Sequence, residues 1–188
     1  MSVELPQKIQ ARRRSARIAI VAARYNGKYM TALLENCLAE LKEAYPLDEF
    51  PVYRVPGSYE VPVMVKRCIE KPEGGEAPEA VIALGVILRG STAHADLVGH
   101  SVANKLLDIA CDTLVPVVNE VLLLDDEQQA FARCVASTLN RGREAARVAL
   151  QMLEDIDMQQ GAVRRLSASA AGVLKNVEFN HAETETQA

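Results

Sequence analysis

Short apolar runs alternate along this chain with longer stretches in which apolar residues recur every three or four positions. The run over 80–88 is almost unbroken and too short for an ordinary helix, which is typical of a parallel strand covered on both faces. Similar runs lie at 17–23, 50–55 and 115–123. The pattern therefore predicts four strands, each followed by a helix.

The stretches after these runs have the spacing of one helix face. The first predicted helix ends before Pro46. The helix after the fourth strand is expected to begin near Asp125 or Asp126, since acidic residues favour a helix N-terminus. Residues 140–142 separate it from a last helix, and beyond Met158 the periodicity fades.

Four alternations of strand and helix imply right-handed crossovers and a three-layer, flavodoxin-like α/β fold, an open sheet of four parallel strands with helices on both faces. Ligands bind such sheets at the carboxyl ends of the strands. The turns at those ends carry an aromatic (Tyr25), a carboxylate (Glu60) and a histidine (His94). We therefore expect a binding site where these turns meet.

The turn after the third strand has the residues to bind an anion. Gly90 leaves the backbone accessible, and Ser91 and Thr92 add hydroxyls just before a helix whose first amides can bind phosphate or carboxylate. His94 lies in the same positive field, which favours a neutral ring that can accept a proton. The alternative is a helix capped by Ser91 or Thr92, with a histidine at the surface.

The length of 188 residues fits one α/β domain, which we place at 17–158 between an N-terminal arm (1–16) and a mobile C-terminal tail (159–188). The formal net charge is -4, from 21 basic and 25 acidic residues, so the chain offers no basic surface for nucleic acid or an anionic membrane. The basic cluster at 12–14 is either a solvated arm or part of an assembly interface.

The four cysteines, Cys37, Cys68, Cys111 and Cys134, lie far apart on apolar positions of helical stretches. We expect them to be thiols of the core in a reducing compartment, not disulfides, metal ligands or nucleophiles. The sequence shows neither a stretch typical of a transmembrane helix nor the apolar centre of a signal peptide. These features predict a cytoplasmic protein.

Four motifs occur in order: Arg24-Tyr25-Asn26, then Val-Pro-Gly-Ser-Tyr-Glu-Val-Pro at 55–62, then Gly-Ser-Thr-Ala-His at 90–94, then Asn-Arg-Gly at 140–142. In this order and spacing they resemble the 6,7-dimethyl-8-ribityllumazine synthase family over 17–149. The resemblance implies condensation of 5-amino-6-(D-ribitylamino)uracil with 3,4-dihydroxy-2-butanone 4-phosphate, which releases phosphate and water in the penultimate step of riboflavin biosynthesis. It implies small-molecule substrates and no metal or redox cofactor.

The same resemblance assigns roles to individual positions. Proton transfer falls to His94, and a further part in catalysis to Glu144. Substrate binding falls to Tyr25 for the pyrimidine ring, Ser58 and Glu60 for the ribityl chain with Tyr59 between them, the backbone of Ile87 and Leu88 for the uracil edge, and Ser91, Thr92 and Arg133 for the phosphate.

The resemblance also implies an assembly. Active sites lie between the subunits of a pentamer, or of a decamer or larger shell built from pentamers. The arm at 1–16 can add a strand to the sheet of a neighbouring subunit.

Among the departures from the family pattern, those at Asn119 and Glu120 bear most directly on the site. Asn119 takes a substrate-binding position where the family usually has an aromatic side chain that reaches a neighbouring subunit's site, and Glu120 replaces a glycine. One stacking surface, worth about 1 kcal/mol of ring binding, is therefore absent. The alternative function is a weakly active or inactive homologue that binds a lumazine or flavin-like ring as an oligomeric scaffold.

Overall fold

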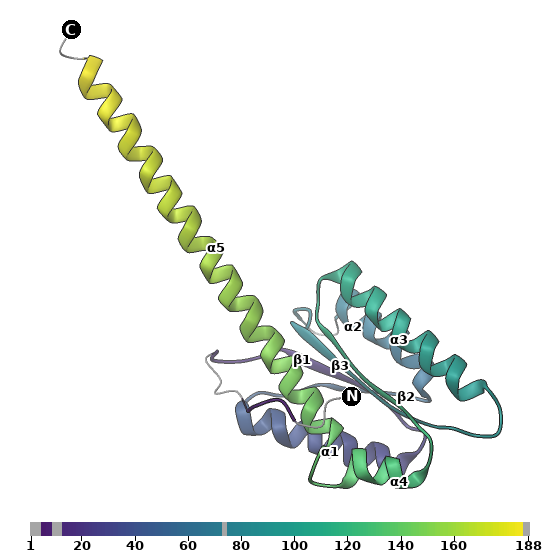
Figure 1. Ribbon diagram of the computed structural model, residues 1–188. Coiled ribbons are helices and arrows are strands. Elements are labelled where there is room, and N and C mark those ends of the chain that lie inside the picture. The colour runs from purple at the N-terminus through teal and green to yellow at the C-terminus, as the bar shows by residue number, and fades with distance from the viewer. Residues whose placement is uncertain (1–4, 9–12, 73–74, 186–188) are drawn as a thin grey trace. The chain divides into compact units, whose positions relative to one another are not determined.

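A four-stranded parallel sheet forms the centre of the fold (Figure 1). The computed structural model describes residues 5–8, 13–72 and 75–185. The strand order is β2-β1-β3-β4, with β1 at Ile18–Ala23, β2 at Val52–Val55, β3 at Ala80–Leu88 and β4 at Val117–Leu124. The predicted α/β class and the parallel sheet are confirmed.

Helices cover both faces of this sheet (Figure 1). One face carries α2 (Val61–Glu70) and α3 (His94–Thr113), and the other carries α1 (Gly27–Ala44), α4 (Glu127–Ala130) and the first part of α5 (Arg141–Glu185). Every residue of β1 is buried, because the sheet has a hydrophobic core on each face and successive side chains of β1 pack into the two cores in turn. This burial on two sides explains the continuous apolar run.

The predicted helix starts agree with the structure. Asp126 is the N-cap of α4, and its side chain accepts a hydrogen bond from the backbone N–H of Gln129 at 2.7 Å. The last helix, α5, begins at Arg141, within the predicted break at 140–142. The stretch between them differs from the single helix that the spacing predicted, since α4 is continued by η2 (Phe131–Val135), a π-helical turn.

All four cysteines are free, and three of them, Cys37, Cys68 and Cys134, are buried as predicted. The prediction is wrong for Cys111, which is exposed. Cys111 lies two positions beyond Ile109, a core residue of α3. Two residues turn an α-helix by about 200°, so the thiol is carried to the outer face.

The described part of the N-terminal arm lies against helices of its own chain. Lys8 forms an ion pair with Glu43 of α1 at 2.6 Å, and the Arg147 guanidinium donates to the backbone oxygen of Pro6 at 2.7 Å. Addition of a strand to a neighbouring subunit stays a prediction. Arg12, in the basic cluster, lies outside the described residues.

The chain divides into two units, Met1–Leu153 and Glu154–Ala188. Helix α5 continues to Glu185, so the segment for which the sequence predicted a separate tail from residue 159 is helical up to that point. The mobility of this segment stays a prediction, and residues 186–188 lie outside the described part. Within the described residues, no helix combines the length and apolarity needed to cross a membrane.

Candidate active site

A cleft of about 560 Å³ opens at the carboxyl end of the sheet. Its lining includes residues from the turns after three different strands, which are Tyr25 after β1, Ser58, Tyr59 and Glu60 after β2, and His94 after β3. Gly57 and three residues of α3, namely Leu97, Val98 and Ser101, complete the lining. The structure therefore brings these five predicted site residues to one place.

The backbone around Tyr25 is fixed by its neighbours, while its ring is left open. The N–H groups of Arg24 and Tyr25 both donate to the backbone oxygen of Pro56 at 3.1 Å. Asn26 adopts the left-handed conformation with a φ of 59°, and its side-chain amide donates to the backbone oxygen of Val86 at 2.7 Å. Tyr25 is 69% exposed, so its ring can accept a planar partner.

Gly57 lies close to two of the lining side chains. Its N–H donates to Oε2 of Glu60 at 2.9 Å. A Cβ built at Gly57 would lie 3.0 Å from the same Glu60 oxygen and 3.0 Å from Cδ2 of Tyr25. Contacts this short are tighter than nine in ten real Cβ contacts, so a larger residue at position 57 would require the Tyr25 ring and the Glu60 carboxylate to move by a few tenths of an ångström. The Pro-Gly-Ser-Tyr-Glu turn thus sets the spacing between the Tyr25 ring and the Glu60 carboxylate.

Ser58 is buried at the floor of the cleft against the central strand β3. A Cβ at Gly85 of β3 would lie 2.7 Å from Oγ of Ser58 and 2.9 Å from Cγ1 of Val121. The Ser58 hydroxyl can therefore approach the strand only because residue 85 has no side chain. The Ser58 hydroxyl therefore packs closely against the backbone of β3.

The turn at 89–93, for which the sequence predicted anion binding, leads directly into α3, whose first residue is His94. The N-cap position is taken by Ala93, which makes no side-chain capping bond. Thr92 Oγ1 instead accepts a hydrogen bond from the His94 N–H at 3.4 Å. Ser91, Thr92 and His94 are all exposed, and His94 faces the cleft.

Arg89 anchors the start of this turn. Its guanidinium pairs with Asp96 in the first turn of α3 at 2.9 Å and with Asp125 after β4 at 3.0 Å. Its backbone N–H donates to the Leu124 oxygen at 2.8 Å. The turn is therefore attached both to the helix that follows it and to the neighbouring strand.

Ile87 and Leu88 form the carboxyl end of β3 and are partly buried. They pair with Leu123 and Leu124 of β4, whereas the register of β3 with β1 ends at Leu84. The two residues are not among those that line the cleft. Their predicted backbone contact with the uracil edge stays a prediction.

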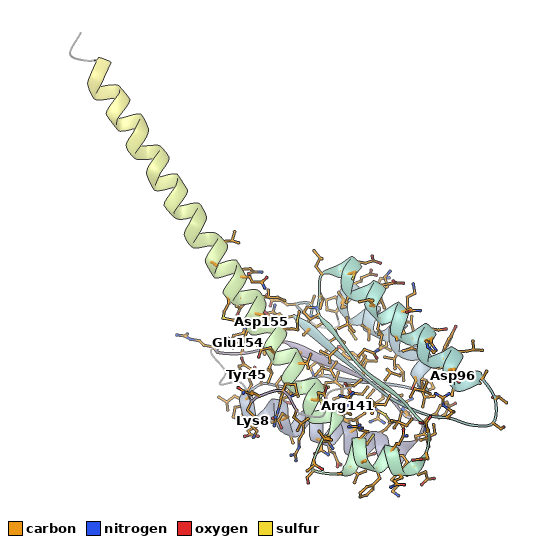
Figure 2. The ribbon with its side chains drawn as sticks, viewed as in Figure 1. Lys8, Tyr45, Asp96, Arg141, Glu154 and Asp155 are labelled. Atoms are coloured by element: carbon orange, nitrogen blue, oxygen red, sulfur yellow. The ribbon has the colours of Figure 1, made fainter. Side chains whose placement is uncertain are left out.

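Arg133 and Glu144 do not line this cleft. Both belong to the layer of α1 and α5, where Glu144 pairs with Arg141 of the same helix. Figure 2 shows Arg141 at the start of α5, well apart from Asp96 in the first turn of α3. A single chain thus keeps Arg133 and Glu144 apart from the predicted site residues that line the cleft.

Asn119 and Glu120 point to opposite faces of the edge strand β4, because side chains alternate along a strand. Asn119 is exposed, and its Oδ1 accepts the Val121 N–H at 3.1 Å. Glu120 is buried in the α5 layer, with Oε2 3.7 Å from Nε of Arg141. Neither residue lines the cleft.

Burial raises the pKa of the Glu120 carboxyl to about 7, because the interior disfavours its charged form. The positive charges of Arg141 and Arg133 oppose this shift, and the negative charge of Glu144 adds to it. Glu120 therefore exchanges its proton near neutral pH.

The sequence did not predict several residues of the cleft, nor the contact between β4 and α5. Leu97, Val98 and Ser101 follow His94 at helical spacing, so their presence beside it could have been found from the period alone. The contact of Glu120 with Arg141 joins positions on different elements and has no local sequence signal.

A family model described as 6,7-dimethyl-8-ribityllumazine synthase matches residues 15–156 of this chain. Curated relatives carry the same name. A Rhodopseudomonas palustris protein named 6,7-dimethyl-8-ribityllumazine synthase 1 is 38% identical over 149 residues, which cover 79% of this chain and 90% of the relative. A Nitrobacter hamburgensis relative is 38% identical over 73% of this chain and 84% of its own. A Thermococcus gammatolerans relative is 37% identical over 73% of this chain and 86% of its own length.

Proposed function

This chain belongs to the 6,7-dimethyl-8-ribityllumazine synthase family, and from that premise we propose how its residues carry out the family's reaction. It is a transferase of riboflavin biosynthesis that acts on small-molecule substrates. The substrates are 5-amino-6-(D-ribitylamino)uracil and 3,4-dihydroxy-2-butanone 4-phosphate. The observation that best supports the proposal is the cleft that joins Tyr25, Glu60 and His94.

The pyrimidine substrate binds in the part of the cleft nearest β1 and β2. The exposed Tyr25 ring stacks on the pyrimidine, and Ser58, Tyr59 and Glu60 hydrogen-bond the ribityl hydroxyls. The backbone of Ile87 and Leu88, which extends past the end of the β1 pairing, reads the uracil edge. Ring stacking and edge recognition together orient the attacking amine.

The phosphorylated substrate binds at the start of α3. The hydroxyls of Ser91 and Thr92 and the first amides of the helix hold its phosphate, since a helix N-terminus favours a negative charge. His94, at the first position of α3, then moves protons as the imine forms and phosphate leaves. Because both substrates are held in register, moderate acid–base catalysis is sufficient.

Arg133, Glu144 and Asn119 reach the cleft of a neighbouring subunit. Support for this proposal is that all three lie away from the cleft of their own chain. The assembly is a homo-oligomer, a pentamer or a multiple of it, in which each cleft receives the Arg133 guanidinium as a second ligand for the phosphate. The four free cysteines agree with a cytoplasmic, reducing location.

The test of this function is to mix the purified protein with both substrates and follow the absorbance of the lumazine product. We expect product formation well above the spontaneous background. In Arg133→Ala we expect the KM for the phosphorylated substrate to rise about tenfold or more, with a smaller change in kcat, because a charge-assisted phosphate contact is lost.

Arg143→Ala is the matched control, since Arg143 lies on the same helix layer and bonds Asn36 of α1 at 3.2 Å. It should leave the KM unchanged. If the wild type forms no product above background, the enzyme assignment is contradicted and the scaffold alternative is favoured. The lack of an aromatic ring at Asn119 supports that alternative.

A further inference from the structure

Glu120 places a buried acidic group beside the basic residues of the α5 layer. Its side chain is 10% exposed, and its Oε2 lies 3.7 Å from Nε of Arg141. This oxygen has no hydrogen-bond partner among the described residues. Arg141 is also held by Glu144, one turn along α5. A carboxylate that is buried with so little hydrogen bonding does little for stability, so its charge is the property to examine.

The charged and titratable groups that act on Glu120, or on which it acts, come from three elements. They are Cys37 on α1, Arg133 and Cys134 on η2, and Arg141 and Glu144 on α5. Burial raises the pKa of both thiols, that of Cys134 to about 12, so both stay neutral at physiological pH. The net charge of this cluster is therefore set by the guanidinium groups of Arg133 and Arg141 and by the carboxyls of Glu120 and Glu144.

With Glu144 ionised and Glu120 neutral, the two guanidinium groups leave one positive charge in excess. When Glu120 ionises, that excess is removed. We propose that Glu120 determines how strongly this enzyme holds the phosphate of its four-carbon substrate, because its buried carboxylate lies beside Arg141 and offsets the positive charge of Arg141 and Arg133. Glu120 acts through these arginines and is a positioning residue, not a catalytic one.

This inference rests on the proposed function, because it takes Arg133 as the phosphate ligand. The carboxyl has a raised pKa of about 7, so Glu120 is neutral below that pH and negative above it. A dianion should therefore bind more tightly at pH 6 than at pH 8. Titrating groups that do not interact with Glu120 act alike in the wild type and in a Glu120 variant, so the difference between the two proteins reports Glu120 and the groups around it.

Sulfate is a suitable probe, since it stays a dianion over this range. Its dissociation constant is measured by calorimetric titration of the full-length protein at constant ionic strength, for the wild type and for Glu120→Gln. We expect Glu120→Gln to bind sulfate about three- to tenfold more tightly than the wild type at pH 8, and equally at pH 6. With the natural substrates at pH 8, we expect Glu120→Gln to have a lower KM for the phosphorylated substrate than the wild type, with little change in kcat.

Two further variants separate charge from packing. Glu120→Asp keeps the charge and should bind like the wild type, whereas Glu40→Gln removes an equally buried carboxylate that pairs with Arg147 at 2.7 Å and should have no effect. If Glu120→Gln does not fold, Glu120→Gly removes the same charge. Equal sulfate affinity of wild type and charge-removed variant at pH 8, or an Asp variant that behaves like Gln, would overturn the inference.

Lumazine formation by the wild type is measured in parallel. Product together with unchanged sulfate affinities overturns this inference alone. Absence of product overturns the proposed function, and a difference in sulfate affinity would then still establish the effect of Glu120 on anion binding.

Discussion

Replacing His94 by alanine is expected to lower the kcat of lumazine formation about 100-fold, with little change in either KM. His94 lines the cleft as the first residue of α3, and an imidazole is the side chain that most often serves in general acid–base catalysis. The alanine variant keeps the helix start and the hydroxyls of Ser91 and Thr92, so substrate binding should persist. Steady-state kinetics with each substrate varied in turn measures both parameters.

The matched control is His100→Ala. His100 is exposed on the same helix, with Nδ1 2.7 Å from the backbone oxygen of Asp96, and it does not line the cleft. This variant should retain wild-type kinetics. Equal kcat for the wild type and His94→Ala would show that orientation of the substrates, and not proton transfer by this side chain, accounts for the rate.

Replacing Gly142 by alanine is expected to destabilise the protein by about 4 kcal/mol or to prevent folding. A Cβ at this position would lie 2.2 Å from the backbone oxygen of Leu33 and 3.1 Å from the backbone nitrogen of Cys37. Both atoms belong to the backbone of α1, which cannot move aside as a side chain can. The start of α5 therefore touches α1 backbone to backbone, and this contact requires glycine.

Gly161→Ala is the control for this substitution, because Gly161 lies on the same helix and its Cβ would have nothing within 4 Å. It should be neutral or stabilising by up to about 1 kcal/mol, the helix preference of alanine over glycine. Urea or thermal unfolding compares the two variants. A Gly142→Ala protein with wild-type stability would mean that the α1–α5 contact is not as close as the structure shows.

The strands could be predicted because burial leaves a direct mark on the sequence. The run at 80–88 coincides with β3, and the run at 17–23 differs from β1 by one residue. The strand start predicted from the run at 50–55 is less accurate, since β2 begins only at Val52. Phe50 is apolar because it packs in the core before the strand starts. An apolar run thus indicates which residues are buried, and it indicates where a strand begins and ends only indirectly.

The grouping of the site residues could be predicted only in part. That Tyr25, Glu60 and His94 meet follows from the rule that carboxyl ends of parallel strands share one edge. The placement of Arg133 away from them depends on how η2 packs on α1, which no local pattern encodes. The contact of Glu120 with Arg141 likewise joins β4 to α5 and needs the three-dimensional fold.

The proposed function requires that each active site joins the cleft of one subunit to Arg133 of the next. His94→Ala and Arg133→Ala are co-refolded in equal amounts and assayed at a low concentration of the phosphorylated substrate, where each variant alone is nearly inactive. If sites are shared, one half times one half, or about a quarter, of them hold both native residues, and activity should recover to about that fraction of wild type. A mixture no more active than the mean of the two variants would contradict the shared site.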